Sequence, residues 1–284
     1  MMSNQYYIKG LEGVSIETIT ECFNKAFSDY SVPIQSTARE LQERLTGNGY
    51  APQWSTGVFE EDRLLAFVLH GIKDIGGSFK LYNAGTGAVP TARGQSLTLK
   101  QYEYLLPKAR QAGCTGVELE VIIDNEPAIH SYKKVGFHIS NTLASFKAGT
   151  ENLAISTPHE ILEVEAINWQ QVQGFWDWKP SWQHSRNALM ANWKLHKSVQ
   201  VMQAGEVLGY AIFNPESGRM AQFAVSQAHR NRGIGKALFA YAQKACRKTL
   251  TVVNVDSRAL HTLAFLEKIG FEPLLQQYEM QLTL

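Results

Sequence analysis

The sequence predicts an α+β protein with a mixed α/β sheet, built as two tandem copies of one domain. Its 284 residues suit two domains of roughly 100–200 residues each. Two segments end alike, in Gly136-Phe137 and Gly270-Phe271. Upstream of these pairs, Arg93 aligns with Arg230, and the interval between the two arginines is nearly that between the two glycines. Two features in the same order at nearly the same interval indicate a repeated domain.

The two copies are expected to meet in the small polar stretch 148–152, where glycine and polar residues favour a turn. The first copy then covers residues 1–148 and the second covers 155–284. A repeat of roughly 140 residues is far too long for a solenoid. The content of 44% hydrophobic and 19% charged residues is ordinary for a folded domain.

The first copy reads as helices, antiparallel strands, and then strand–helix–strand–helix. Val117, Leu119 and Val121 alternate with acidic residues, which is the pattern of a half-buried strand. Pro127 lies in the first turn of the next helix and Gly136 just past its end. The expected elements are helices at 16–27, 37–45, 97–112 and 125–135, and strands at 57–70 (two strands around an acidic turn), 79–89 and 117–121.

The second copy follows the same order. A turn at 204–206 separates two strands, and an apolar stripe at helical spacing marks the long helix. The expected elements are strands at 199–202, 207–213, 220–225 and 250–255, and helices at 233–247 and 258–269.

Charge and cysteine usage argue against several classes of protein. Lys plus Arg is 27 and Asp plus Glu is 26, so a net charge of +1 speaks against a dedicated nucleic-acid-binding domain. Three distant cysteines without a CxxC pair speak against a disulfide scaffold or a zinc finger, and we expect no metal. No apolar run approaches the ~20 residues of a membrane span, and the first residues lack a signal-peptide core. We expect a cytoplasmic protein with no nucleic-acid or membrane partner.

A basic, glycine-containing turn lies between a strand and a helix of the second copy. It reads His229-Arg230-Asn231-Arg232-Gly233-Ile234-Gly235-Lys236. Such a turn points free backbone N–H groups at one spot at the positive end of a helix, which favours a phosphate. Its two glycines leave room for a phosphate to approach the backbone, and its cations add positive charge. The alternative is a solvated basic turn whose glycines serve local geometry.

These segments resemble the GCN5-related N-acetyltransferase (GNAT) family. The pyrophosphate-binding signature of that family, Q/R-x-x-G-x-G/A, is complete at Arg230, Gly233 and Gly235. A helix pattern of the family, N-x-x-A-x-x-x-Y-x-x-x-G-F, is complete from Asn125 to Phe137. The resemblance covers most of the chain as two tandem GNAT-like domains. It implies a splayed antiparallel-to-parallel sheet and an acetyl-CoA-dependent enzyme that acetylates a primary amine by direct transfer.

The two copies depart from the family pattern in complementary ways. The first keeps Arg93, but Ser96 and Thr98 stand where the signature has glycine-type residues, so a Cβ faces the expected phosphate. The second keeps its loop, but Leu266 stands where the first has Tyr132, and leucine donates no proton. The resemblance therefore favours the second copy as the better cofactor binder and the first copy as the carrier of the acid.

Direct transfer needs a base for the attacking amine and an acid for the departing thiolate. The position of Tyr132 in the family pattern suits the acid, with core packing as the alternative role. Glu118 and Glu120 share one strand face and either could be the base, with Glu120 taken as the candidate, while Asp256 and His261 are further candidates in the second copy. Asn125 either caps its helix or touches the cofactor. The acetyl-CoA site implied by the resemblance comprises Phe223, Ala224, Val225, Arg230, Asn231, Arg232, Gly233, Ile234, Gly235 and Lys236 in the second copy, and Val89, Arg93, Gly94, Gln95, Ser96 and Asn125 in the first.

Five of the six tryptophans fall in the short segment from Trp169 to Trp193. They form either an acceptor pocket or a packed interface between the two copies. The main alternative function is a non-catalytic acyl-CoA-binding or scaffold protein, motivated by Ser96 and Leu266. A nucleic-acid-binding regulator using the 229–232 turn is a further alternative. The acceptor is expected to be a small-molecule or protein amine, and the sequence leaves its identity and the oligomeric state open.

Overall fold

The structure is a computed structural model that describes residues 6–29, 35–149 and 159–284. It divides into two compact units, one made of Met1–Ser140 with Tyr278–Leu284 and the other of Asn141–Gln277. Each unit combines a sheet of parallel and antiparallel strands with helices on both faces, so the predicted mixed α/β fold is confirmed.

The first unit contains the elements expected of the first copy and one additional strand at its start. These elements are β1 (Tyr7–Gly10), α1 (Ile16–Ala26), α2 (Ala38–Gly47), β2 (Thr56–Glu60), β3 (Arg63–Asp74), β4 (Phe79–Ala88), α3 (Leu97–Gln111), β5 (Cys114–Ile122) and α4 (Glu126–Val135), with parts of β6 (His138–Ala148) and β12 (Phe271–Thr283). The strand order is β1-β2-β3-β4-β5, and the end of β12 lies beside β5. Strands β1 to β4 pair antiparallel, whereas β5 runs parallel to β4.

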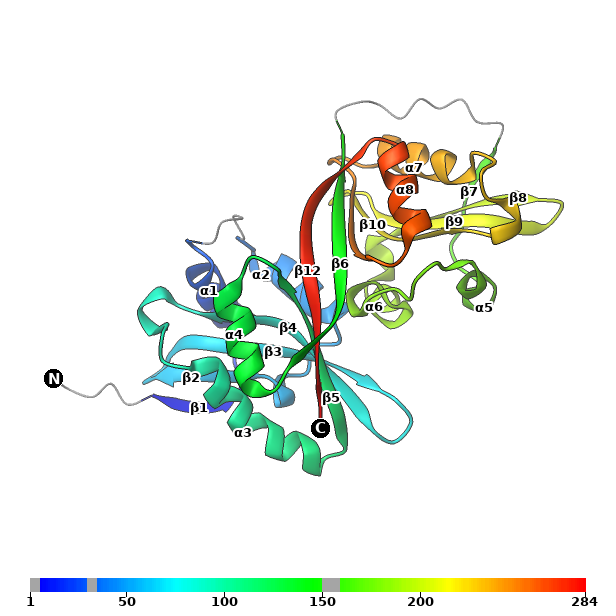
Figure 1. Ribbon diagram of the computed structural model, residues 1–284. Coiled ribbons are helices and arrows are strands. Elements are labelled where there is room, and N and C mark those ends of the chain that lie inside the picture. The colour runs from blue at the N-terminus through cyan, green and yellow to red at the C-terminus, as the bar shows by residue number, and fades with distance from the viewer. Residues whose placement is uncertain (1–5, 30–34, 150–158) are drawn as a thin grey trace. The chain divides into compact units, whose positions relative to one another are not determined.

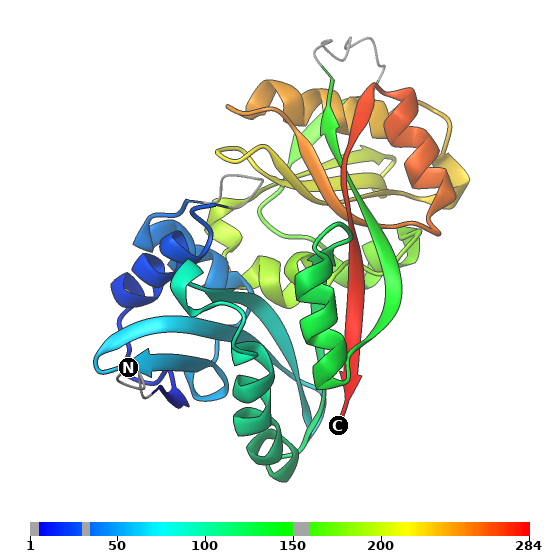
Figure 2. The ribbon, with the colours of Figure 1, turned by 60° about the vertical axis from the view of Figure 1, so that its left-hand side comes forward.

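Helices cover both faces of this sheet (Figures 1 and 2). On one face, α1 and α2 bury Phe23 and Leu41 against β2 and β3. On the other face, α3 and α4 bury Tyr102 and Ile129 against β5. Local signals start these helices, since the side chain of Ser15 caps α1 and Thr37 forms a capping box at α2.

The second unit repeats the plan with shorter helices before its strands. Its elements are β7 (Ile161–Glu163), α5 (Trp169–Val172), α6 (Arg186–Ala191), β8 (Lys197–Gln203), β9 (Glu206–Asn214), β10 (Arg219–Val225), α7 (Ile234–Ala245), β11 (Thr251–Asp256) and α8 (Leu260–Lys268). The strand order is β7-β8-β9-β10-β11-β6, with β10 and β11 parallel and the other pairs antiparallel. None of the described helices is long and apolar enough to cross a membrane.

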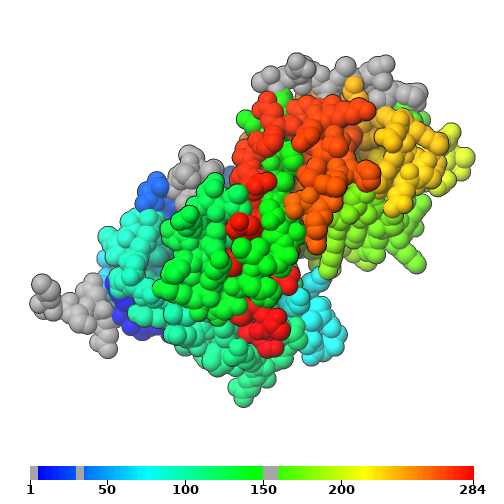
Figure 3. Space-filling view, viewed as in Figure 1, coloured from blue at the N-terminus to red at the C-terminus, as the bar shows by residue number. Residues whose placement is uncertain are grey.

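The last residues of the chain belong to the first unit. Met280 and Leu282 are buried in the core that α3 and α4 share, and the backbone N–H of Leu284 donates to Thr115 at 3.2 Å. In Figure 3 the red atoms of this end lie among green atoms of the first unit. Residues 141–148 of β6 instead pack in the second unit. The bounds of the two compact units therefore differ at β6 and β12 from the bounds expected for the two sequence copies, 1–148 and 155–284. Those copy bounds describe the repeat in the sequence and stay a prediction. Of the expected join at 148–152, residues 150–152 lie outside the described residues.

Both units contain a splay where two parallel strands part. Pairing between β4 and β5 ends at Tyr82 and Glu118, and pairing between β10 and β11 ends at Met220 and Val252. Strands β4 and β10 each carry a one-residue bulge near this point. The bulged residues are Ala84 and Ala221, which are separated by the same interval as the two loop arginines. A bulge leaves its residue out of the ladder and turns the strand, so the two copies open in the same way.

Candidate functional site

The loops that join β4 to α3 and β10 to α7 have the same backbone conformation. Gly94 and Asn231, at equivalent positions, have φ angles of 76° and 62°, and Ser96 and Gly233 have φ angles of 54° and 83°. These values lie in the left-handed region, which glycine adopts without the clash that a Cβ causes. Ser96 adopts it at a cost of roughly 1–2 kcal/mol. The serine of the first loop therefore keeps the shape that glycine gives the second.

Both loops lead into a helix that lacks a side-chain cap. Helices α1, α2, α4, α5 and α6 each begin with a Ser, Thr or Asn side chain that accepts a backbone N–H. Ser96 at the start of α3, Gly233 at the start of α7 and Ala259 at the start of α8 make no such bond to any described residue. The first-turn N–H groups of α3 and α7 are therefore available to an anion, which the positive end of the helix also favours.

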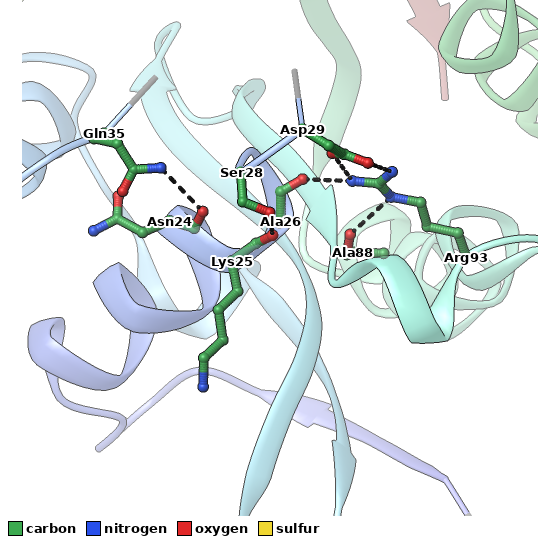
Figure 4. Close-up of polar contacts among 8 residues, drawn as sticks. All are labelled: Asn24, Lys25, Ala26, Ser28, Asp29, Gln35, Ala88 and Arg93. Atoms are coloured by element: carbon green, nitrogen blue, oxygen red, sulfur yellow. Dashed lines mark hydrogen bonds and ion pairs between the residues drawn. The ribbon is translucent and has the colours of Figure 1, made fainter. Parts of the chain in front are cut away.

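Arg93 fastens the first loop to the segment that follows α1 (Figure 4). Its two terminal nitrogens donate to the carboxylate of Asp29 at 2.7 Å each. The same guanidinium donates to the backbone oxygen of Ala26 at 2.8 Å and to that of Ala88 at 3.2 Å. Hydrogen bonding from Arg93 lowers the pKa of Asp29. The arginine thus holds its loop against the end of β4 and the end of α1.

Arg230 repeats this arrangement in the second copy. Its Nη1 lies 2.8 Å from a carboxylate oxygen of Asp177. Its Nη2 donates to the backbone oxygen of Phe175 at 3.1 Å, and its Nε donates to that of Val225 at 3.2 Å. Both arginines direct their guanidinium at the protein itself, so they shape the loops that carry the N–H groups.

Glycine is favoured for a different physical reason at each of the two glycine positions of the second loop. A Cβ on Gly233 would meet its nearest described neighbour only at 4.0 Å, so the positive φ and not crowding favours glycine there. A Cβ on Gly235 would lie 2.9 and 3.0 Å from ring atoms of Phe265 on α8. Helix packing therefore explains Gly235 without a phosphate. Arg232 and Lys236 are exposed beside Gly233 and provide positive charge at this end of α7.

A buried polar chain lies next to the bulge of the first copy. Nδ1 of His70 donates to the backbone oxygen of Trp54 at 2.8 Å, because a carbonyl only accepts. Nε2 of His70 then accepts from the hydroxyl of Tyr102 at 3.2 Å, and that hydroxyl accepts from the amide of Asn83 at 3.0 Å. Burial lowers the pKa of His70 to about 4, so the imidazole is neutral at pH 7. The chain fixes Asn83, which precedes the bulged residue Ala84.

Tyr132, the candidate acid, lies on α4 and is 8% exposed. Its ring packs edge-on against Phe137 with the centroids 5.7 Å apart. The side chain of Asn125 caps α4 by accepting from the backbone N–H of Ala128 at 3.2 Å. The structure thus shows a packing role for Tyr132 and a capping role for Asn125, while their roles in transfer and cofactor binding stay predictions.

The two strand glutamates of the first copy have different partners at the splay. Glu120, the candidate base, accepts a hydrogen bond from the phenol of Tyr82. Glu118 pairs with Lys80 at 2.7 Å. Since Tyr82 is the last residue of β4 that pairs with β5, its phenol holds Glu120 just where the strands part.

A pocket lies in the splay of the second copy, with an empty volume of about 380 Å³ that includes the open space at its mouth. Its strand walls are residues 220–223 of β10, with the bulge, and residues 252–254 of β11. The remaining lining comes from the aromatic segment and from β9, namely Trp176, Trp178, Pro180, Ser181, His184 and Tyr210. Part of the aromatic segment thus lines a pocket within the second unit, and its role as an acceptor pocket stays a prediction.

The polar groups of this pocket are neutral. Nε1 of Trp176 donates to the hydroxyl of Tyr210 at 2.6 Å, and that hydroxyl donates to the side-chain oxygen of Gln222 at 2.8 Å. Burial lowers the pKa of His184 to about 3 and raises the pKa of Tyr210. Among the described residues that line the pocket none is a carboxylate, so it offers uncharged donors and acceptors to a ligand.

Both units match known proteins. The Acetyltransferase (GNAT) family matches residues 16–137 and 164–271. The chain is similar to the solved GCN5-related N-acetyltransferase from Sphaerobacter thermophilus, with a TM-score of 0.72 and 12% identity over 100% of this chain and 97% of that one. It is also similar to a tandem GNAT protein from the clavulanic acid biosynthesis pathway, with a TM-score of 0.72 and 13% identity over 98% of each chain. At these identities the likeness is one of fold. No curated protein matches the sequence.

Proposed function

The chain belongs to the acetyltransferase (GNAT) family, and from that premise we propose that it transfers an acetyl group from acetyl-CoA to a primary amine. One observation carries the proposal. At the end of each splayed strand, a loop with two left-handed residues leads into a helix without a side-chain cap. The same anion-binding geometry therefore occurs twice.

Each loop is proposed as a pyrophosphate site for acetyl-CoA, the first in the resting chain and the second only in a conformation that admits the acyl arm. In the first copy the holding residues are Val89, Arg93, Gly94, Gln95 and Ser96, with Asn125 contributing through the start of α4. In the second copy they are residues 223–225 and 230–236. The arginines act by fixing the loops, and the backbone N–H groups bind the anion. Main-chain N–H groups near the splay are proposed to polarise the carbonyl of the thioester.

The transfer itself is proposed for the first copy. Acetyl-CoA supplies an acetyl thioester there. Glu120, held by Tyr82, takes a proton from the acceptor amine, and Tyr132 gives a proton to the departing sulfur. In the second copy Asn254 and Leu266 stand at the positions of Glu120 and Tyr132, at the interval that separates the two Gly-Phe pairs. An asparagine amide does not act as the base, and a leucine cannot donate the proton. That replacement favours a non-catalytic acyl-CoA-binding or scaffold role for the second copy.

The acceptor is proposed to be a small-molecule or protein amine. The test is a calorimetric titration with acetyl-CoA, followed by measurement of free thiol released with a panel of small amines and of peptides with free amino ends. Release that depends on Glu120 and Tyr132 supports the proposal. Tight binding without thiol release from any amine would instead favour the non-catalytic alternative for the whole chain.

We also propose a reducing, cytoplasmic setting. The cysteines Cys22, Cys114 and Cys246 are free thiols, and the first two are buried. Burial raises the pKa of Cys22 to about 12, so this thiol is not a reactive nucleophile at neutral pH. Free, inert thiols suit a compartment that keeps cysteines reduced. Fractionation of the native host with detection of this chain tests the setting.

A further inference from the structure

We propose that residues 176–178 form a strap that closes the second copy to the acyl arm of acetyl-CoA, so that acetyl-CoA fills the first copy and reaches the second only when the strap opens. This proposal rests on the proposed function, because it concerns the path of the acyl arm. It assigns a role to Trp176, Asp177 and Trp178 that the family match does not.

The path of the acyl arm follows from the positions of its two ends. An arm that begins at a pyrophosphate on residues 230–236 and reaches the main chain of residues 223–225 must run along β10. Pairing of β10 with β11 ends at Met220 and Val252. The edge of β10 beyond Met220 is therefore the edge that faces the splay, and the arm must enter the splay to reach it.

Asp177 joins the two sides of that splay. One carboxylate oxygen lies 2.8 Å from Arg230, which follows β10, and the other accepts from the hydroxyl of Thr262 at 2.9 Å. Thr262 lies on α8, which follows β11, and it is 5% exposed. A single side chain therefore bonds to the elements that follow each of the two parted strands. The strap is fastened across the mouth of the splay.

Trp178, which follows Asp177, contacts the parted strand β10. Its ring packs edge-on against Phe223 of β10, with the centroids 5.8 Å apart. Phe223 in turn contacts Phe239 and Phe265, with ring centroids at 4.8 Å and 6.3 Å. Trp178 also lines the pocket together with Asn254 of β11. The indole thus contacts β10 and lines the pocket that β11 also lines, so it takes up part of the splay that an acyl arm would need.

The first copy keeps the arginine–aspartate pair but has a different residue at the helix position that binds the second carboxylate oxygen in the second copy. Ala128 is the counterpart of Thr262 in the repeat, and alanine has no hydroxyl to bind Asp29. Thr86 is the counterpart of Phe223 and replaces a ring with a small side chain. The fastening on α8 and the aromatic wall are thus features of the second copy.

Thr262→Val removes the hydroxyl at nearly constant volume, and Thr262→Ser is the matched control that keeps it. We expect acetyl-CoA to titrate with one site per chain in the wild type and in Thr262→Ser, and with two in Thr262→Val. Adding Gly233→Val should remove the extra site, whereas Ser96→Val should remove the original one. A wild type that binds two equivalents, or that loses its one site with Gly233→Val, overturns the proposal.

Hydrogen exchange of residues 175–179 tests the strap without acetyl-CoA. Losing a bond to a charged acceptor should speed exchange on the order of tenfold in Thr262→Val, with little change in Thr262→Ser. Unchanged exchange in a folded Thr262→Val protein overturns the strap. If exchange responds as expected while neither the wild type nor any variant binds acetyl-CoA, the closure stands and the proposed function fails.

Discussion

Arg93 holds Asp29 through two hydrogen bonds of 2.7 Å, one from each terminal nitrogen of its guanidinium. This two-pronged contact needs a planar fork, which lysine lacks. Arg230 and Asp177 form the matching pair in the second copy. In both copies the arginine of the loop is therefore a structural element of the loop, anchored to the segment before the central strands.

Arg93→Lys should weaken acetyl-CoA binding by the first copy on the order of tenfold, because a single ammonium cannot reproduce the fork and the loop loses its anchor. Isothermal titration measures the dissociation constant. Lys100→Gln is the control, since Lys100 is an exposed cation on α3 and its removal changes the charge without touching the anchor. Equal affinity of Arg93→Lys and the wild type would show that the anchor does not shape the binding site.

Tyr132→Phe should lower kcat by roughly 10²–10⁴-fold if protonation of the thiolate limits the rate. The ring and its contact with Phe137 remain, so the protein should stay folded and KM for acetyl-CoA should change much less. Steady-state kinetics with an identified acceptor, together with a thermal melt, separates the two effects. Full kcat in Tyr132→Phe would assign the phenol to packing alone.

Gly233→Val and Gly235→Val should fail in different ways. Valine at 233 enters open space with an unfavourable positive φ, so we expect weaker acetyl-CoA binding by any open second site and a folded protein. Valine at 235 meets the ring of Phe265, so we expect a loss of roughly 1–3 kcal/mol in the free energy of unfolding, as in an overpacked core. Urea denaturation measures the second effect. A Gly235→Val protein as stable as the wild type would contradict the packing argument.

His70 should make the first unit sensitive to mild acid. Its folded pKa is about 4 because of burial, whereas an unfolded histidine has a pKa near ~6.5. Between these values the unfolded chain binds more protons, so stability falls as the pH drops from about 6.5 toward 4. The expected loss from pH 7 to 5 is on the order of 2 kcal/mol. Urea denaturation across this range checks it, and His70→Gln should flatten the slope. An unchanged slope in that variant would assign the acid sensitivity to other groups.

The parts of the fold that follow from neighbouring residues could be predicted from the sequence. The expected helices at 16–27 and 125–135 are confirmed at Ile16–Ala26 and Glu126–Val135, because Ser15 and Asn125 cap them and Gly136 ends the second with a positive φ. The strand pattern around 117–121 is confirmed within Cys114–Ile122. The turn at 204–206 is confirmed as well, since the adjacent Ala204 and Gly205 both have positive φ.

The parts that depend on distant residues could not be predicted. Asp29 lies 64 residues before Arg93, whereas Asp177 lies 53 residues before Arg230, so the two aspartates do not share the interval of the repeat. The place of Tyr278–Leu284 in the first unit was missed because the strand that it pairs with lies far away in the sequence. In addition, few residues of β12 are buried, and the strand shows little apolar alternation. The hydrogen bond from Thr262 to Asp177 was missed because a threonine on a helix indicates no particular partner.

The place of the last segment, Tyr278–Leu284, in the first unit has a consequence for the order of events during synthesis. Once Ser140 has been added, the ribosome must still translate the whole of Asn141–Gln277 before it reaches the segment that completes this unit. At roughly 5–20 residues per second this delay is about 7–27 s. The half of the protein that is translated first is therefore finished last. A nascent chain that stalls before Tyr278 carries β5 with an unpaired edge, which is open to pairing with other chains.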